Sequence, residues 1–291
     1  MNPENRDNRQ ILAFGAEGQE KIKRTKAGIV GVGGLGSHLV QQLSYLGVRD
    51  FVLVDPDDVS TVNLNRIVCS TPSDVGVKKV DVARRTILSV AGQETTSISA
   101  FACDLRIGGA LNALSGCNVL FGCVDRDGAR LILNELAVTA RIPYFDLAFG
   151  INPEGGKIAE AGGRVALVMP GGPCMLCYGD IDSNEAGYDL ASGSEKAFAR
   201  ERGYVAGFDI PQPSVVSLDG IVASVAATEF LALKTGFREP MLYSCYYMLD
   251  GELRQIHSRP VGTCAHHLYE GSSLEDLMRR YCVQPENPVS Q

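Results

Sequence analysis

The first 150 residues alternate between short apolar runs and segments whose apolar residues recur at helical spacing. The runs are continuous, as in strands buried on both faces of a sheet, and lie at residues 27–32, 51–54, 118–124 and 144–149, with a shorter strand expected at 96–102. The helical segments between them lie at residues 37–46, 78–90 and 127–141. This alternation predicts an α/β fold of βαβ units, with helices covering a doubly wound, mostly parallel sheet.

The pattern changes after about residue 150. Residues 179–203 are small, acidic and glycine-containing with little apolar periodicity, which predicts a mobile loop. A helix is expected over residues 215–234, followed by alternating strands at 243–249 and 253–257. We expect these last strands to extend the parallel sheet as antiparallel neighbours.

A glycine-rich motif, Gly31-Val32-Gly33-Gly34-Leu35-Gly36, joins the first predicted strand to its helix. Glycines at such a turn let backbone N–H groups approach a phosphate, and the helix N-terminus favours negative charge. Asp55 ends the second strand, where a carboxylate can accept hydrogen bonds from ribose hydroxyls. These features predict a nucleotide site, and a nicotinamide-dependent oxidoreductase would need no more.

Further charged residues follow the ends of the strands. Asn63-Leu64-Asn65-Arg66 comes after the second strand, Lys78 and Lys79 begin the next helix, and Asp125 follows the strand at 118–124. The glycine-rich loop alone can bind the diphosphate of NAD. Extra cations at the ends of the strands therefore favour a triphosphate ligand and a pyrophosphate leaving group. A carboxylate that faces phosphates is typical of a site for a divalent cation.

Taken in order, these motifs resemble those of the ThiF/MoeB/HesA adenylyltransferases, bacterial relatives of the ubiquitin-activating enzymes. The set comprises Arg6-Asp7-Asn8-Arg9-Gln10, the glycine-rich motif, Asp55 with Asp57, Asn63 to Arg66, Gly76 with Lys79, and Cys123-Val124-Asp125. The likeness runs from about residue 5 to about residue 267. It implies a Rossmann-like sheet and ATP-dependent adenylation of a carboxylate with release of pyrophosphate.

The resemblance also implies a role for each matching residue. The nucleotide contacts would come from Gly31, Gly33, Gly34, Gly36, Asp55, Asp57, Asn63, Arg66 and Lys79, with Asp55 on the ribose and Asn63, Arg66 and Lys79 on the phosphates. Asp125 would place Mg²⁺, and Arg9 would reach the γ-phosphate bound by a neighbouring subunit, so a homodimer is expected. Lys78 matches less well than Lys79, because the family's lysine falls three residues after the glycine at position 76.

The family's usual acyl donor is the C-terminal glycine of a ubiquitin-like or sulfur-carrier protein, which implies an open groove and a covering loop. The expected organisation is a helical arm (1–25) and one adenylation domain (26–291), with a nucleotide half (26–150), a zinc- and carrier-binding half (151–270) and a polar tail (271–291). Alternative functions are adenylation of a non-protein carboxylate such as a modified tRNA base, nicotinamide-dependent oxidoreduction, and non-catalytic scaffolding in a heterodimer.

Amino-acid composition limits the kinds of binding partner and the cellular compartment expected for this protein. The net charge of −7 argues against general binding to nucleic acid or to a membrane surface, which are both anionic. No apolar run approaches the roughly 18 residues that a membrane span needs. Nine cysteines, an odd number, in a chain without an apolar targeting stretch indicate a reducing, cytoplasmic setting.

Four residues form a candidate zinc site. Cys174 and Cys177 follow a Gly-Gly-Pro turn at the spacing that lets two thiolates hold one metal ion. The family's second cysteine pair corresponds to Cys264-Ala265-His266-His267, so a site of three cysteines and His267 is expected. His266 is the alternative ligand.

The family's acceptor cysteine has no counterpart here. Many relatives carry it between the first zinc pair and the following helix, whereas this sequence has no cysteine from Tyr178 through Ser244. Either a displaced thiol, Cys245 or Cys282, accepts the acyl group, or the acyl group passes directly to a separate protein or to a sulfur donor.

Overall fold

A single eight-stranded sheet forms the centre of the molecule, which is described by a computed structural model over residues 6–92, 96–202, 213–257 and 272–283. The strand order is β3-β2-β1-β4-β5-β6-β7-β8. The strands are β1 (Lys26–Val30), β2 (Asp50–Val54), β3 (Ser97–Phe101), β4 (Val119–Gly122), β5 (Tyr144–Glu154), β6 (Lys157–Val168), β7 (Tyr243–Tyr247) and β8 (Glu252–Gln255). The first five are parallel and the last three are added antiparallel, which confirms the predicted fold class.

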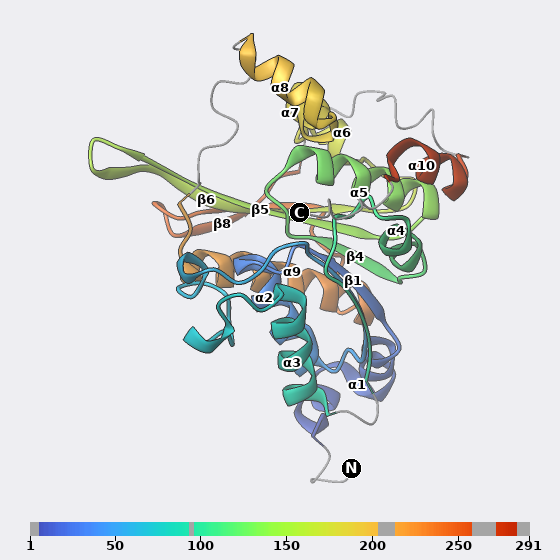
Figure 1. Cartoon of the computed structure of the whole chain (residues 1–291). Helices are drawn as coiled ribbons and strands as arrows, with labels where there is room; N and C mark the ends of the chain where they lie inside the picture. Colours follow the sequence, from blue (N-terminus) through green and yellow to red (C-terminus); the bar gives the residue numbers. More distant parts are fainter. Residues whose placement is uncertain (1–5, 93–95, 203–212, 258–271, 284–291) are drawn as a thin grey trace.

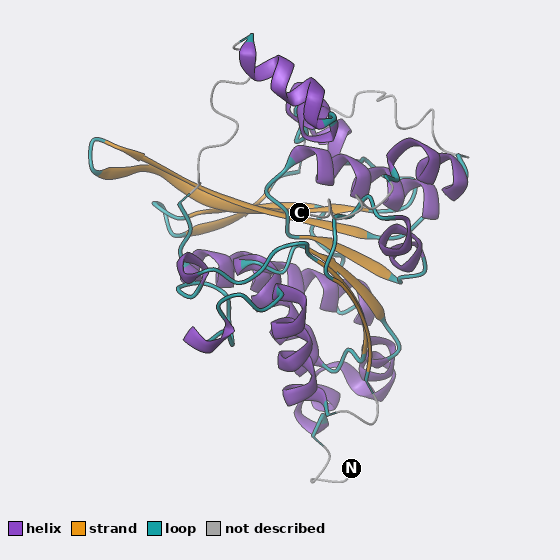
Figure 2. Ribbon diagram, viewed as in Figure 1, coloured by secondary structure: helices purple, strands orange, loops and turns teal. Residues whose placement is uncertain are grey.

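Helices cover both faces of this sheet (Figures 1 and 2). One face carries α1 (Asn8–Lys23), α2 (Gly34–Leu46), α3 (Lys79–Ala91) and α9 (Val216–Thr235). The other carries α4 (Gly108–Ser115), α5 (Asp127–Ala140), α6 (Met175–Tyr178) and α10 (Leu274–Tyr281), with α7 (Ser183–Leu190) and α8 (Gly193–Glu201) beyond them. The described residues build two large hydrophobic cores, one on each side of the sheet, and a small third cluster of Val59, Ile67 and Val82.

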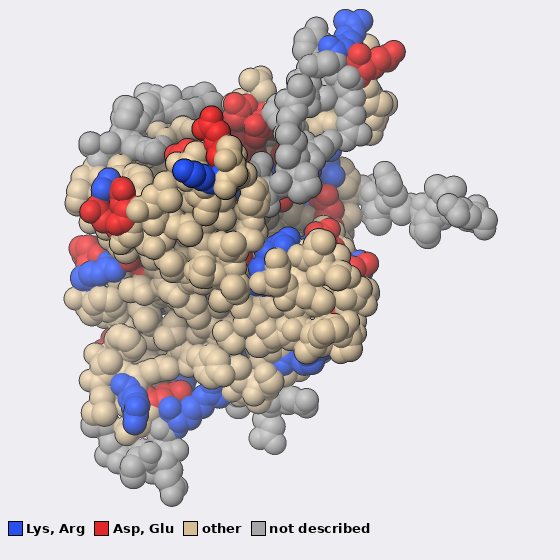
Figure 3. Space-filling view, turned by 90° about the vertical axis from the view of Figure 1, so that its left-hand side faces the viewer, with Lys and Arg blue, Asp and Glu red and all other residues tan. Residues whose placement is uncertain are grey.

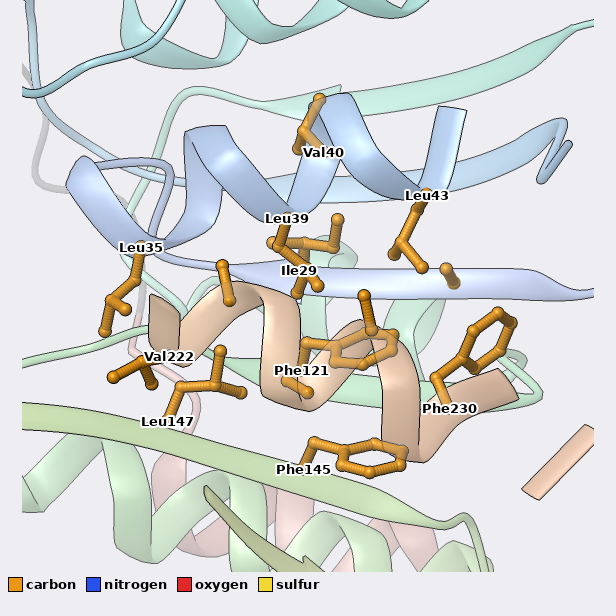
Figure 4. Packing of buried hydrophobic residues seen from close by; sticks show 14 of the residues in the cluster. Ile29, Leu35, Leu39, Val40, Leu43, Phe121, Phe145, Leu147, Val222 and Phe230 are labelled. Atoms are coloured by element: carbon orange, nitrogen blue, oxygen red, sulfur yellow. The ribbon is translucent and has the colours of Figure 1, made fainter. Parts of the chain in front are cut away.

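The core under α2 and α9 brings together side chains from strands and helices (Figure 4). Phe121 of β4 stacks on Phe145 of β5 with ring centroids 5.1 Å apart, and meets Phe230 of α9 edge-on at 5.9 Å. By length and hydropathy α9 could span a membrane, so the sequence does contain one apolar stretch of that length. Half of that stretch is buried inside the molecule, where α9 packs against α2, α1 and the sheet.

Two segments are more helical than their sequences indicate. Most of the predicted loop at 179–203 forms α7 and α8, and the Asp182 carboxylate caps α7 by accepting hydrogen bonds from the backbone N–H groups of Asn184 and Glu185. Within the predicted polar tail, α10 begins at a capping box of Ser273 and Asp276 and buries Leu277. Side-chain caps mark the starts of α7 and α10, and α10 also carries Leu274, Leu277, Met278 and Tyr281 at helical spacing against the core.

Candidate active site

The glycine-rich loop follows β1, which is the strand at which the order of the sheet reverses. β2 and β3 lie on one side of β1, and β4 and β5 lie on the other. Gly31 has a φ of +84°, and a Cβ built there would lie 2.4 Å from the Cys123 carbonyl oxygen. A Cβ on Gly36 would lie 2.0 Å from the Gly31 carbonyl oxygen, whereas one on Gly33 would meet nothing within 4 Å. Gly31 and Gly36 therefore have no room for a side chain, while the position of Gly33 is open.

The first turn of α2 presents its backbone N–H groups at this loop. Gly33 is the N-cap, and no side chain caps the helix. Unmet N–H groups together with the positive end of the helix dipole form an anion site when a phosphate is present.

Asp55 fixes the loop from the end of β2. Its Oδ2 accepts a hydrogen bond from the Val32 N–H at 2.6 Å, and its Oδ1 accepts one from the Asp57 N–H at 2.9 Å. The side chain is buried, and burial raises the pKa of Asp55 against the opposing effect of Lys79. The predicted ribose ligand thus also holds the backbone of the phosphate loop.

Lys79 is the lysine that turns toward this edge. Its Nζ lies 2.7 Å from Asp57 Oδ2 and 4.0 Å from Asp55 Oδ1. Lys78 instead pairs with Asp58 at 2.8 Å and donates to the Pro56 carbonyl. The structure brings Lys79, Asp55 and Asp57 together and directs Lys78 elsewhere.

Asn63 and Arg66 follow on the loop after β2. The Asn63 amide oxygen accepts from the backbone N–H and hydroxyl of Ser60, so a phosphate contact would fall to its amide nitrogen. Arg66 Nη1 donates to the Val62 carbonyl at 2.6 Å and to Asn65 Oδ1 at 3.2 Å. Arg66 is therefore folded onto its own loop, half-buried, and would have to turn to meet a phosphate.

Asp125 lies exposed on the loop after β4, two residues beyond the Cys123 carbonyl that packs against Gly31. Arg130 of α5 supports this loop by donating to the Val124 carbonyl at 2.9 Å. An exposed carboxylate beside a phosphate loop is a suitable ligand for a hard divalent cation.

Arg9 is placed apart from these residues. It is exposed on α1, where the neighbouring Gln10 donates to the Tyr45 carbonyl at the C-terminal end of α2. Since α2 has 13 residues, its two ends lie about 20 Å apart. Arg9 is thus distant from the phosphate loop of its own chain, and its predicted role on a neighbouring subunit's nucleotide stays a prediction.

One further residue at the loop was not anticipated from the sequence. Asp219 of α9 is fully buried, and a Cβ built on Gly34 would lie 2.1 Å from its Oδ2. Burial raises the pKa of Asp219 to about 6. The only sequence signal is a lone acid near the start of an apolar helix.

The cysteine pair of the candidate zinc site lies at the start of α6. Cys174 and Cys177 are buried, with their Sγ atoms 3.8 Å apart. Cys264, His267 and the alternative His266 lie outside the described residues. Within the described ranges no three metal-binding side chains come together, so the zinc site stays a prediction.

The two candidate displaced nucleophiles lie away from the phosphate loop. Cys245 is in β7, paired in register with Arg164 of β6. Cys282 follows α10, where burial raises the pKa of its thiol and therefore disfavours the reactive thiolate.

The surface face in Figure 3 carries its charges in small groups of both signs, set among uncharged residues. Among the residues coloured there, the lysines and arginines form no extended basic surface. Such a face is poorly suited to general binding of nucleic acid.

A glycine-rich loop at the switch point of a doubly wound sheet, with a lysine and carboxylates at the same edge, defines a nucleotide-binding α/β protein. The ThiF family pattern matches residues 7–268, and the chain belongs to the ThiF family.

Curated relatives match the chain over part of its length. "Adenylyltransferase and sulfurtransferase UBA4" of Saccharomyces cerevisiae (strain RM11-1a) is 30% identical over 164 residues, 56% of this chain and 35% of that protein. "SAMP-activating enzyme E1" of Haloferax volcanii is 28% identical over 163 residues, 56% of each chain. The chain therefore spans about a third to about half of the length of these relatives.

Solved structures share the fold over most of the chain. MccB of E. coli, solved with AMPCPP and MccA, has a TM-score of 0.70 at 19% identity, covering 91% of this chain and 73% of that one. PaaA has a TM-score of 0.63 at 22% identity, covering 87% and 82%. At these identities the likeness concerns the fold.

Proposed function

We propose that this protein is an adenylyltransferase that uses ATP to activate the C-terminal carboxylate of a ubiquitin-like or sulfur-carrier protein. The observation that carries the proposal is the convergence of Lys79, Asp55 and the uncapped first turn of α2 at one edge of the sheet. Membership of the ThiF family and relatives named as adenylyltransferases support it.

The proposed step is an in-line displacement at the α-phosphorus of ATP. A carboxylate oxygen of the carrier forms a new P–O bond, and the bond to the bridging oxygen breaks, so that its electron pair leaves with pyrophosphate. No side chain has to give or take a proton. The protein therefore contributes by positioning two anions and by offsetting their charge.

Lys79 is suited to that electrostatic role. It is held at the edge of the site by Asp57, whose side chain is exposed, so a triphosphate can compete for the ammonium group. Arg66 and the N–H groups of α2 would add to the charge on the phosphates.

The proposal includes two metal ions. Asp125 would hold Mg²⁺, which when bound would offset the charge of the departing pyrophosphate. The 3.8 Å separation of the Cys174 and Cys177 sulfurs matches two corners of a tetrahedron with Zn–S bonds of about 2.3 Å. Cys264 and His267 would complete a structural zinc site.

The proposed assembly is a homodimer in which Arg9 of one subunit serves the other. Because no cysteine occurs from Tyr178 through Ser244, we propose that a separate protein or a sulfur donor accepts the activated acyl group.

ATP–pyrophosphate exchange with candidate carriers tests this function. Lys79→Ala is expected to lower carrier-dependent exchange about 100-fold, a magnitude typical of removing one charge-stabilising group. The adjacent Lys78→Ala is the matched control and should change exchange less than about twofold, because Lys78 is directed to Asp58. Unchanged exchange in Lys79→Ala, or no exchange by the wild type with its genuine carrier, would contradict the proposal.

A further inference from the structure

The Asp219 carboxylate is packed against the phosphate loop without any intervening side chain. It projects from the fourth residue of α9 and is fully buried. Any side chain at Gly34 would collide with its Oδ2, so the carboxylate contacts the backbone of the first turn of α2 directly. This is the same turn whose N–H groups would receive a phosphate.

The hydrogen bonds of this carboxylate are incomplete. Oδ2 accepts one hydrogen bond, from the Ser214 hydroxyl at 3.2 Å. Oδ1 is buried and has no hydrogen-bond partner in the described part of the chain. An ionised carboxylate with a single neutral donor is poorly stabilised when buried, so the neutral acid is favoured, and its pKa is about 6.

In the described part of the chain, the ionisable groups around Asp219 come from three other elements. Arg66, on the loop after β2, is the cation that lowers the pKa of Asp219. Cys123 follows β4, and the negative charge of Asp219 contributes to the raised pKa of the Cys123 thiol. His38, one turn along α2, packs on Gly220 and has its pKa lowered by burial.

We propose that Asp219 is a positioning residue of the nucleotide site that takes up one proton from solvent when a triphosphate binds the glycine-rich loop. The inference rests on the proposed nucleotide site. A triphosphate at the first turn of α2 brings negative charge beside Asp219. It also attracts Arg66, and thereby removes the cation that stabilises the ionised form. Both effects favour the neutral carboxyl group.

Proton uptake is measured by titrating the full-length protein with magnesium and the ATP analogue AMPCPP in a calorimeter. At pH 7, two buffers of different ionisation enthalpy give the number of protons bound per nucleotide. The wild type is expected to take up a substantial fraction of one proton more than Asp219→Asn, which cannot titrate. Its affinity should fall by up to about tenfold per pH unit above pH 6, while that of the variant stays flat.

His38→Gln is the matched control, because His38 titrates nearby, and it should keep the wild-type uptake. Equal uptake by the wild type and Asp219→Asn would overturn the inference while leaving the nucleotide site intact. No binding by the wild type at any pH would overturn the proposed function as well. Should Asp219→Asn not fold, infrared difference spectra of the wild type decide the matter, because a protonated carboxyl band must appear when the nucleotide is added.

Discussion

Replacing Asp219 by asparagine in the nucleotide-free protein should change its stability in a way that depends on pH. The pKa of this acid is about 6 in the folded protein, against an ordinary value of 3.8. Below about pH 3 the group is protonated in both the folded and the unfolded chain, so it adds no pH-dependent term. Between about pH 3 and pH 6 the unfolded chain ionises first, and folding becomes progressively less favourable.

Above about pH 6 this penalty levels off at about 3 kcal/mol, the free energy equivalent to the difference between the two pKa values. Asparagine has its own pH-independent cost, because its amide group is buried at the same place. That cost cancels when the effects at pH 8 and pH 4 are subtracted. Asp219→Asn should therefore be more favourable at pH 8 than at pH 4 by about 2 kcal/mol in the free energy of unfolding, because part of the penalty is already present at pH 4.

Urea unfolding of both proteins at the two pH values measures this difference. Asp81→Asn, a change at an exposed acid of α3, is the control and should show little pH dependence. An Asp219→Asn effect of the same size at pH 4 and pH 8 would show that the buried carboxylate is already well stabilised, and the reasoning would fail.

Three further outcomes are expected. Gly36→Ala should destabilise the fold by about 1–3 kcal/mol in urea unfolding, because its Cβ would overlap the Gly31 carbonyl. Gly33→Ala is the control and should be nearly neutral, and similar losses in both variants would contradict the packing argument. Phe121→Ala should cost about 3–5 kcal/mol by the same measurement, since it removes a fully buried ring between two others, and a loss below about 1 kcal/mol would contradict it. Elemental analysis should find about one zinc per wild-type chain and none in Cys174→Ser, and a metal-free wild type would refute the zinc proposal.

Buried strands were the most predictable part of this fold. Continuous apolar runs ending in glycine or aspartate give β1, β2 and β4 nearly to the residue, because strands covered on both faces need such runs. Helices α7 and α10 begin at side-chain caps, Asp182 and Ser273, which a search for long apolar runs overlooks. α10 does repeat apolar residues at helical spacing, but a run of eight residues does not stand out within a polar tail.

The candidate site was predictable where its residues follow the strands along the chain. Lys79 could be preferred to Lys78 by motif spacing, and the structure places it beside Asp55. Asp219 could not be found in this way, because its importance arises from the packing of α9 on α2 at Gly34. A contact between helices so distant in the sequence leaves no local pattern.

Arg130 connects the Asp125 loop to a buried charge network that the sequence also did not indicate. Its guanidinium group donates to the Val124 carbonyl, pairs with Asp127 at 2.7 Å and lies 3.5 Å from Asp146. Asp146 is fully buried and pairs with Arg164 of β6 at 2.8 Å. The candidate magnesium residue is therefore supported from the antiparallel half of the sheet.

The same network continues to the cysteine pair. Arg164 lies 3.6 Å from Asp180. Asp180 comes two residues after the end of α6, the short helix that contains Cys177 and is preceded by Cys174. Removing one member of a buried charge cluster leaves the others uncompensated, at a cost of about 3–5 kcal/mol. Displacement of α6 would therefore destabilise the charge pairs of this network. A zinc ion at the cysteine pair would thus act at a distance from the nucleotide, by holding α6 in place. Its contribution to the reaction would be the stability of the sheet edge that supports Asp125, and not chemistry at the α-phosphate.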